Sequence, residues 1–240
     1  YLGSRGINAK ILWDGLKKGA DPLGEENLLI FGPGLLSGTM APSSGRMSVT
    51  CKSPSTNLYL KTNVGGHFGT ELKLAGYDIL VFEQSSKNPV YLYIEDEKVE
   101  IRDADDLWGL DVRETDILLK KRHGDCQVTT IGQGGENLVM FSSVMCSIYN
   151  AAGRGGAGAV MGAKKLKAIA VRGNRAVKTT QPEKFMEETH KIRAALSEDS
   201  SVEGLFDYGT SGSLQGINEM GELPSYNFKT GYFKDAYKIS

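Results

Sequence analysis

The sequence lacks any apolar run of the roughly 18–20 residues that a helix needs to cross a bilayer. No secretory signal peptide is visible in its 240 residues. It also lacks an excess of charge of either sign, since 28 basic and 29 acidic residues give a net charge of −1. A balanced surface of this kind does not attract nucleic acid or an anionic membrane. We therefore expect a cytoplasmic protein with no nucleic acid partner and no membrane partner.

Cysteine and histidine are scarce, with three residues of each. The cysteines form no CxxC pair and are odd in number, which is typical of ordinary thiols in a reducing compartment. The histidines show no HxH or HxxxH spacing, so the sequence has no local zinc or iron motif. These six residues are Cys51, Cys126, Cys146, His67, His123 and His190.

The sequence also shows no Ser/His/Asp set, carboxylate pair or Walker motif. We therefore expect the chain to hold a cofactor, with the chemistry supplied by that cofactor and by residues outside the chain. The chain starts without an initiator Met and ends at Ser240 without a helix cap. We interpret it as a piece of a longer protein.

Glycine, by contrast, is plentiful, at 30 of 240 residues, and it clusters in loops. One glycine loop and the helix after it occupy residues 63–73, and a similar pair occupies residues 151–162. Each is followed by a short apolar strand, at 78–82 and at 168–172. Two loops built alike on a duplicated scaffold indicate one ligand that is held from two sides.

The repeat predicts an α+β fold, in which a unit of strands, glycine loop, helix and strand is duplicated to give two β-sheets with pseudo-twofold symmetry. The helices are too few and too short for a regular alternating βαβ array. We expect the matching loops to meet near the symmetry axis. Residues 1–178 would form this domain, and residues 179–240 would begin a following helical domain.

Hydrophobic periodicity and turn residues predict the individual elements. Expected helices span residues 8–18, 68–75, 110–122, 157–165 and 182–196. Expected strands span residues 27–31, 47–51, 58–62, 78–83, 90–94, 98–101, 127–131, 138–143 and 167–171, with residues 132–137 as a connecting loop. The chain after residue 198 is expected to consist of loops.

Residues 153–158 match the GxGxxG pattern of dinucleotide-binding folds. That fold needs a strand leading directly into the first glycine and an acidic residue about 20 positions later. Here residues 147–152 intervene, and residues 173–178 contain no acid. The pattern therefore indicates a glycine loop whose N–H groups can bind an anion, and not a dinucleotide fold.

Two arginines, Arg46 and Arg154, lie inside glycine-bearing loops. Arginine binds phosphate through paired hydrogen bonds, so both are candidate phosphate ligands, while the alternative is that both are surface residues in turns. Asn63 can be a turn residue or can bind the polar edge of a heterocycle. We expect His67 to pack or hydrogen bond, because no carboxylate or nucleophile lies near it in the sequence.

Together these loops resemble the N-terminal domain of the tungsten-containing aldehyde:ferredoxin oxidoreductase family. The resemblance covers nearly all of the chain, and its motifs occur in the same order as in that family. They are Leu2–Gly6, Gly38-Thr39, Ala41-Pro42, Gly45-Arg46, Lys52–Pro54, Asn63–Gly69, Glu71–Lys73, Ala75–Asp78, Ile131-Gly132, Gly135–Asn137 and Ala151–Gly162.

The resemblance implies a bis-pterin (molybdopterin) cofactor that carries tungsten, or with less support molybdenum, and a magnesium ion between the pterin phosphates. Backbone carbonyls of Asn63 and Ala151 would hold the magnesium ion. Arg46 would also bridge toward a [4Fe-4S] cluster, whose CxxCxxxC ligands lie outside this chain. Residues 1–178 would be the tungstopterin-binding domain, truncated at its N-terminus. The implied cofactor-binding residues are Arg46, Asn63, Gly65, Asn150, Ala151, Gly153 and Arg154, and no catalytic residue is assigned.

The implied full-length enzyme oxidises a small aldehyde to a carboxylic acid and passes electrons to ferredoxin or another electron carrier. We expect this fragment alone to be inactive. The sequence leaves open whether the full-length protein forms a homodimer. The pair Tyr149-Asn150 departs from the family, where aldehyde oxidoreductases tend to have His-Arg. One alternative is therefore the tungsten subunit of an aromatic acyl-CoA reductase, and another is a non-catalytic anion- or nucleotide-binding module.

Overall fold

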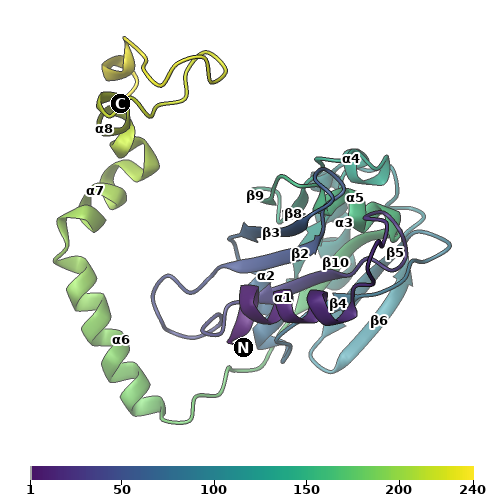
Figure 1. The fold of residues 1–240 in the computed structure, drawn as a ribbon. Coiled ribbons are helices and arrows are strands. Elements are labelled where there is room, and N and C mark those ends of the chain that lie inside the picture. The colour runs from purple at the N-terminus through teal and green to yellow at the C-terminus, as the bar shows by residue number, and fades with distance from the viewer. Residues whose placement is uncertain (1) are drawn as a thin grey trace. The chain divides into compact units, whose positions relative to one another are not determined.

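The computed structural model describes residues 2–240 (Figure 1). Its contacts divide the chain into two compact units, Tyr1–Thr179 and Thr180–Ser240. The first unit contains both β-sheets, and the second contains helices and irregular segments. The predicted site residues all belong to the first unit.

The first unit has a four-stranded sheet with the order β3-β2-β1-β4 and a six-stranded sheet with the order β6-β5-β10-β7-β8-β9. The strands are β1 (Leu29–Pro33), β2 (Met47–Lys52), β3 (Tyr59–Val64), β4 (Leu80–Phe82), β5 (Val90–Glu95), β6 (Lys98–Asp103), β7 (Gln127–Thr130), β8 (Val144–Cys146), β9 (Asn150–Ala152) and β10 (Leu166–Arg172). Its helices are α1 (Gly3–Gly15), α2 (Phe68–Leu74), α3 (Val112–His123), α4 (Gln133–Glu136) and α5 (Ala157–Ala163).

The two sheets share a duplicated arrangement of four strands. The order β9-β8-β7-β10 repeats the order β3-β2-β1-β4, and every neighbouring pair in both sets is antiparallel. Helix α2 connects β3 to β4, and α5 connects β9 to β10. The larger sheet adds the β5–β6 hairpin, with β5 parallel to β10. The predicted α+β class with two sheets is confirmed.

The main core lies between the sheets, where α2 and α5 each contact strands of both sheets. Leu29 and Phe31 face this core from β1, and Ile169 and Val171 face it from β10. These residues alternate along their strands because successive side chains point to opposite faces. The two helices that follow the glycine loops are therefore held from both sides.

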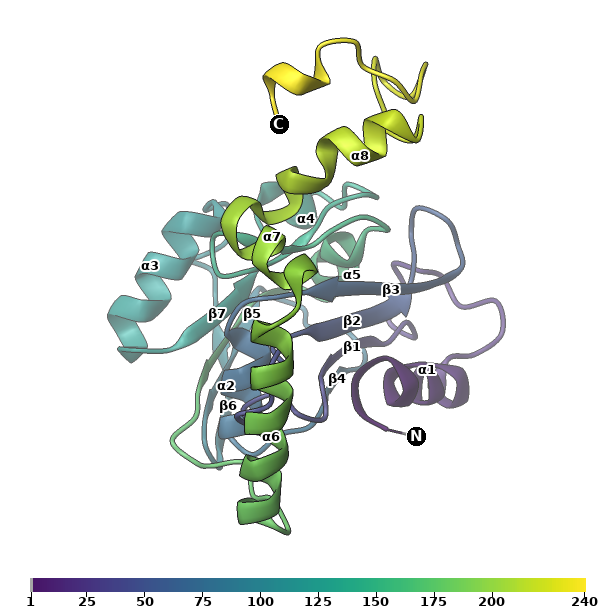
Figure 2. The same ribbon diagram turned by 90° about the vertical axis from the view of Figure 1, so that its left-hand side faces the viewer.

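Each sheet also has an outer helix (Figure 2). Helix α1 covers the outer face of the small sheet through Leu12, which packs on Leu28 and Ile30. Helix α3 covers the outer face of the large sheet through Leu119, which packs in a cluster with Ala168. Ile30 and Ala168 alternate with the core-facing residues of β1 and β10, and Leu28 immediately precedes β1. The period of two along a strand therefore decides which face of the sheet each apolar side chain joins.

The chain between β7 and β9 differs from the prediction. Residues 132–137 contain the short helix α4 and not only a loop, and residues 138–143 form turns and not a strand. Leu138 has a positive φ of 57°, and the N–H of Ser142 binds the carbonyl of Val139 in a local turn. The strand β8 starts only at Val144. The apolar residues of this segment misled the prediction, since Phe141 is largely exposed.

The second unit is more helical than predicted after residue 198. Its elements are α6 (Pro182–Ser197), α7 (Ser200–Tyr208), α8 (Leu214–Glu219) and the 3-10 helices Gly209–Ser213 and Ala236–Lys238. The side chain of Asp199 accepts a hydrogen bond from the N–H of Ser201 and caps α7. Helix α6 matches the prediction and begins with a proline at its first turn.

Candidate functional site

The two glycine loops meet because their strands lie at facing sheet edges. Strand β3 ends the small sheet, β9 ends the large sheet, and the two strands are in contact (Figure 1). Asn63 lies on β3 opposite Ser48, and Ala151 lies at the equivalent place on β9 opposite Met145. An edge strand leaves part of its backbone N–H and C=O groups unpaired. The expected meeting of the loops is therefore observed.

Hydrogen bonds between the repeats fasten the loops together. The hydroxyl of Thr62 donates to the carbonyl of Gly153 over 2.9 Å, and the hydroxyl of Ser53 donates to the carbonyl of Gly155 over 2.7 Å. Both donors are buried side chains of the first repeat, and both acceptors are backbone atoms of the second. The geometry of the second loop thus depends on the first repeat.

The first loop tolerates only glycine at its tip. Gly66 has a φ of +86°, and a Cβ atom at this position would lie 2.6 Å from Nδ2 of Asn150. The backbone conformation disfavours any residue with a side chain, and the tip of the Asn150 side chain would have to move to admit a Cβ atom. A Cβ atom at Gly45 would be 4.0 Å from the carbonyl oxygen of Gly66, so the loop before Arg46 lies beside it. Three loops therefore converge.

The second loop forms a left-handed turn. Arg154, Gly155 and Gly156 have φ values of 64°, 68° and 83°. Within residues 2–240 the N–H groups of these three residues make no hydrogen bond, while two of the carbonyls around them bind the hydroxyls of Thr62 and Ser53. A row of unpaired N–H donors is suited to an anion.

The two candidate arginines add positive charge to this place. Arg46 and Arg154 are exposed, and neither forms an ion pair with any residue in the described chain. An arginine without an acidic partner keeps its five donors available for an anion. The arrangement is an open, cationic face with unpaired backbone donors.

The Asn63 side chain is held by hydroxyl hydrogen bonds that pass through buried Ser48. Ser48 donates to Oδ1 of Asn63 over 3.0 Å, and Ser4 donates to Ser48 over 2.9 Å. Asn8 contacts the same strand through a hydrogen bond from its Nδ2 to the carbonyl of Ser48. The amide nitrogen of Asn63 has no partner among residues 2–240, so it remains available as a donor at the site.

Three other residues near the loops, His67, Tyr149 and Asn150, differ in exposure and in hydrogen bonding. His67 is exposed and its side chain makes no hydrogen bond within the described residues, so the hydrogen-bonding role that was one of its two expected roles is not observed. Tyr149 is also exposed, at 84%. Asn150 is half-buried between the loops and donates a long hydrogen bond of 3.4 Å to Ser147. Of the Tyr149-Asn150 pair, only Asn150 joins the two loops.

A metal ion at this place would need oxygen ligands from the backbone. No three His, Cys, Asp or Glu side chains in the described part of the chain come together as a metal site. The three thiols are buried, and burial raises the pKa of Cys51 and Cys146 to about 12 and that of Cys126 to about 11. Asn63 and Ala151 are exposed residues on adjacent edge strands, which fits a hard cation such as magnesium.

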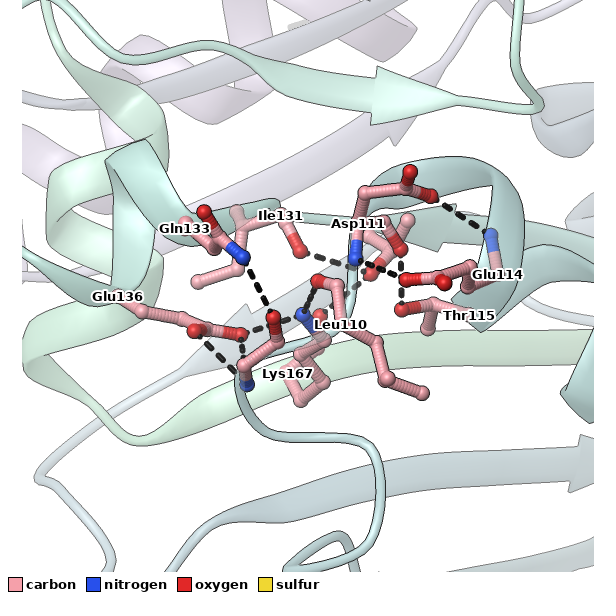
Figure 3. Close-up of polar contacts among 10 residues, drawn as sticks. Leu110, Asp111, Glu114, Thr115, Ile131, Gln133, Glu136 and Lys167 are labelled. Carbon is pink, nitrogen blue, oxygen red and sulfur yellow. Dashed lines mark hydrogen bonds and ion pairs between the residues drawn. The ribbon is translucent and has the colours of Figure 1, made fainter.

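A buried ion pair joins α4 to β10 (Figure 3). Lys167 on β10 pairs with Glu136 on α4, and Lys167 also donates to the carbonyl of Leu110 over 2.8 Å. Glu136 accepts from the N–H of Gly109 as well, so both charges are satisfied. This pair was not predicted from the sequence, although a lysine inside an otherwise apolar strand is a signal for a buried partner.

Helix α4 packs in turn against α5, the helix that follows the second loop. Gly135 on α4 and Gly162 on α5 lie so close that a Cβ atom at position 162 would be 2.0 Å from the carbonyl oxygen of Gly135. The N–H of Gly158 also binds the carbonyl of Ser142 over 3.0 Å. The segment that joins α4 to β8 therefore packs against the second glycine loop and the start of α5.

Among residues 2–240, no helix has the length and apolar character that crossing a bilayer requires.

A family model described as "Aldehyde ferredoxin oxidoreductase, N-terminal domain" matches residues 1–173. The tungsten-containing aldehyde ferredoxin oxidoreductase of Thermococcus kodakarensis is 48% identical over 246 aligned positions, which cover 100% of this chain and 40% of the relative. An aliphatic sulfonate oxidoreductase, WOR-like subunit, of Pyrococcus furiosus is 35% identical over 97% of this chain and 39% of its own length. The chain thus spans about 40% of the length of these relatives.

A solved structure is also similar. It is the active site complex BamBC of benzoyl coenzyme A reductase with 1,5 dienoyl-CoA, at a TM-score of 0.80 and 42% identity. The similarity covers 83% of this chain and 31% of that chain.

Proposed function

Because this chain belongs to the aldehyde ferredoxin oxidoreductase family through its N-terminal domain, we propose that it is the pterin-binding part of a tungsten enzyme. The whole enzyme would oxidise aldehydes to carboxylic acids and pass the electrons to ferredoxin. The remaining 60% or so of the relatives' length would supply the rest of the active site. These 240 residues would then bind and orient the cofactor without completing a turnover.

The convergence of the three loops is the observation that carries this proposal. One face combines two exposed arginines, a left-handed turn with unpaired N–H groups, and two adjacent edge strands. Phosphates need cations and N–H donors, and a hard cation needs oxygen ligands. A pterin cofactor with phosphate groups bridged by magnesium requires both sets of ligands in one place.

Each site residue then has a defined task toward the cofactor. Arg46 and Arg154 would neutralise phosphate charge, and the carbonyls of Asn63 and Ala151 would bind magnesium. The glycines at 65 and 153 would let the backbone approach the pterins without interference from a Cβ atom. Asn150, a neutral residue between the loops, would bind through its amide. When bound, the tungsten cofactor supplies a redox centre that can accept two electrons from the substrate.

The finer assignments belong to the whole enzyme. We propose a [4Fe-4S] cluster bound by cysteines outside this chain, with Arg46 on the side of the cofactor that faces it. We also propose a cytoplasmic location. We propose ferredoxin as the electron acceptor, which the names of the relatives support.

Metal analysis of the full-length protein tests this function. Protein from cells grown with tungstate should contain tungsten, magnesium and pterin, and should reduce ferredoxin when an aldehyde is added. A full-length protein that contains neither tungsten nor molybdenum under these conditions would contradict the proposal. Tight nucleotide binding by such a metal-free protein would favour the non-catalytic binding module.

A second reaction is supported by the similarity to the benzoyl coenzyme A reductase complex, at 42% identity. The neutral Asn150 at a position that touches Gly66 is the local feature that motivates this alternative. A substrate screen with aldehydes and aromatic acyl-CoA thioesters separates the two reactions. Aldehyde oxidation without acyl-CoA turnover supports the first, and the opposite result supports the second.

A further inference from the structure

We propose that Thr62 is a positioning residue, which sets the spacing between the carbonyls of Asn63 and Ala151 and thereby the affinity for the cation between them. This inference rests on the proposed function. Thr62 is 8% exposed, and its hydroxyl donates to the carbonyl of Gly153, 91 residues later in the chain, over 2.9 Å. It is a single side-chain bond that joins the two repeats beside both proposed magnesium ligands.

The covalent chain makes this bond a direct link between the two ligands. Thr62 immediately precedes Asn63, and Gly153 follows Ala151 by two residues. Because peptide units are planar and Cα spacings are fixed, only a few φ and ψ angles separate the bond from each ligand. A change in the distance between Thr62 and Gly153 is therefore expected to change the spacing between the backbones of Asn63 and Ala151.

The same bond also orients an N–H donor. The carbonyl of Gly153 and the N–H of Arg154 belong to one peptide unit, and in a trans peptide they point in opposite directions. Because Thr62 holds the carbonyl, the N–H of Arg154 points away from Thr62, and it has no partner within the described residues. Thr62 thus positions one cation ligand and one anion donor through a single contact.

Ser53 makes a second hydroxyl bond between the repeats, but it lies farther from the proposed magnesium ligands than Thr62 does along the chain. Ser53 binds the carbonyl of Gly155 over 2.7 Å, but it lies in the turn between β2 and β3, farther along the chain from Asn63. Thr62 lies within β3 itself, paired with Val49 in the sheet register. The strand keeps Thr62 rigid, so its hydroxyl can define a distance.

The test uses the full-length protein with the substitutions Thr62→Val and Thr62→Ser. Valine has nearly the shape of threonine but no hydroxyl, whereas serine keeps the donor. The matched control is Thr115→Val, because buried Thr115 on α3 donates a similar hydroxyl-to-carbonyl bond of 2.7 Å to Asp111, the N-cap residue of that helix, away from the loops. Two quantities are measured: the EDTA concentration that removes half of the magnesium, and hydrogen exchange of residues 150–156 in protein made without tungstate.

For Thr62→Val we expect the half-stripping EDTA concentration to fall about tenfold, as expected for the loss of one hydrogen bond, and hydrogen exchange at residues 150–156 to accelerate. Thr62→Ser should restore both values, and Thr115→Val should leave both unchanged. Normal magnesium retention in Thr62→Val, or equal losses in the valine and serine variants, would overturn the role of Thr62. A wild-type protein without tungsten or pterin would instead overturn the proposed function and, with it, the role of Thr62 toward that cofactor.

Discussion

At the scale of single residues, Gly66 is the position where the first loop accepts least change. Its φ of +86° is unfavourable for any L-residue with a side chain, and a Cβ atom would lie 2.6 Å from Asn150 Nδ2. We expect Gly66→Ala to lower the free energy of unfolding by about 1–2 kcal/mol, mainly because of the left-handed backbone. Urea unfolding of the 240-residue chain measures this loss.

The matched control for that change is Gly6→Ala. Gly6 lies within α1, and a Cβ atom there would meet no other atom within 4 Å. Alanine favours a helix over glycine, so this variant should gain about 0.5–1 kcal/mol. Equal effects of the two substitutions would show that Gly66 is not constrained by its neighbours.

His123 is the residue whose protonation should make stability depend on pH. It stacks on Tyr93 at a ring distance of 4.0 Å and contacts the hydroxyl of Tyr91 at 3.1 Å. Burial, and then the positive charges of Arg102 and Arg122, lower the pKa of His123 below its usual 6.5. The folded state therefore binds fewer protons than the unfolded state in this range, and stability is lost as pH falls through 6.5 toward the folded-state pKa.

The measurement is urea unfolding of the 240-residue chain between pH 8 and pH 5. His123→Phe keeps a ring in the stack but removes the titrating group, so the loss of stability below pH 6.5 should become smaller. An unchanged pH profile in this variant would assign the acid sensitivity to other groups.

At the scale of elements, the ion pair between Lys167 and Glu136 holds α4 against β10 (Figure 3). Lys167 is fully buried and Glu136 nearly so. Removing one partner leaves the other charge buried without its counter-charge, which costs about 3–5 kcal/mol. We expect losses of this size for Lys167→Met in urea unfolding.

The double variant tests whether the loss comes from the unpaired charge. In Lys167→Met with Glu136→Gln no charge remains, and the glutamine carbonyl can still accept from the N–H of Gly109. This protein should regain a substantial part of the stability that Lys167→Met loses. A double variant that loses the sum of the two single effects would show that the residues do not interact.

The elements also show which parts of the fold could be predicted from sequence. Strands such as β1 and β10 alternate between two apolar faces, and the loops before α2 and α5 carry glycine pairs, so these elements were found. Strands β8 and β9 have only three residues each, too few for a period to show. Residues 138–143 form turns whose backbone contacts the second loop and the start of α5, a tertiary effect that the local apolar pattern does not contain.

Residues of a candidate site could be proposed from the sequence, but the contacts that connect them could not. The resemblance pointed to Asn63 and Ala151 as a pair, and the structure places them on adjacent edge strands. The bonds from Thr62 and Ser53 to backbone carbonyls join residues about 100 positions apart, and no local spacing reports them. Helix α7 was missed because Asp199 caps a segment whose composition is typical of loops.

At the scale of the whole molecule, the site is an open face on a chain that spans about 40% of its relatives' length. Exposed cations such as Arg46 and Arg154 interact with an anion through water, where charge attraction is weak and salt screens it. We therefore expect the 240-residue chain, incubated with tungstate-grown cell extract, to retain no tungsten and to oxidise no aldehyde. The full-length protein from the same cells is the control, and tungsten retained by the fragment would contradict this expectation.

The division of the chain into two compact units gives the last prediction. Between β10 and α6, residues 176–181 have no regular structure and are mostly exposed, and Lys178 offers a trypsin site there. Arg175, just before this segment, pairs with Glu97, and its N–H binds the carbonyl of Leu74. Proteases need a locally unfolded segment, so cleavage should occur first after Lys178 and leave a stable product that ends there. Mass spectrometry of a short digestion identifies the site. First cleavage at Arg46 or Arg154 would show that the glycine-bearing loops unfold locally more readily than residues 176–181. The hydrogen bonds from Thr62 and Ser53 to the second loop would then be weak in the isolated chain.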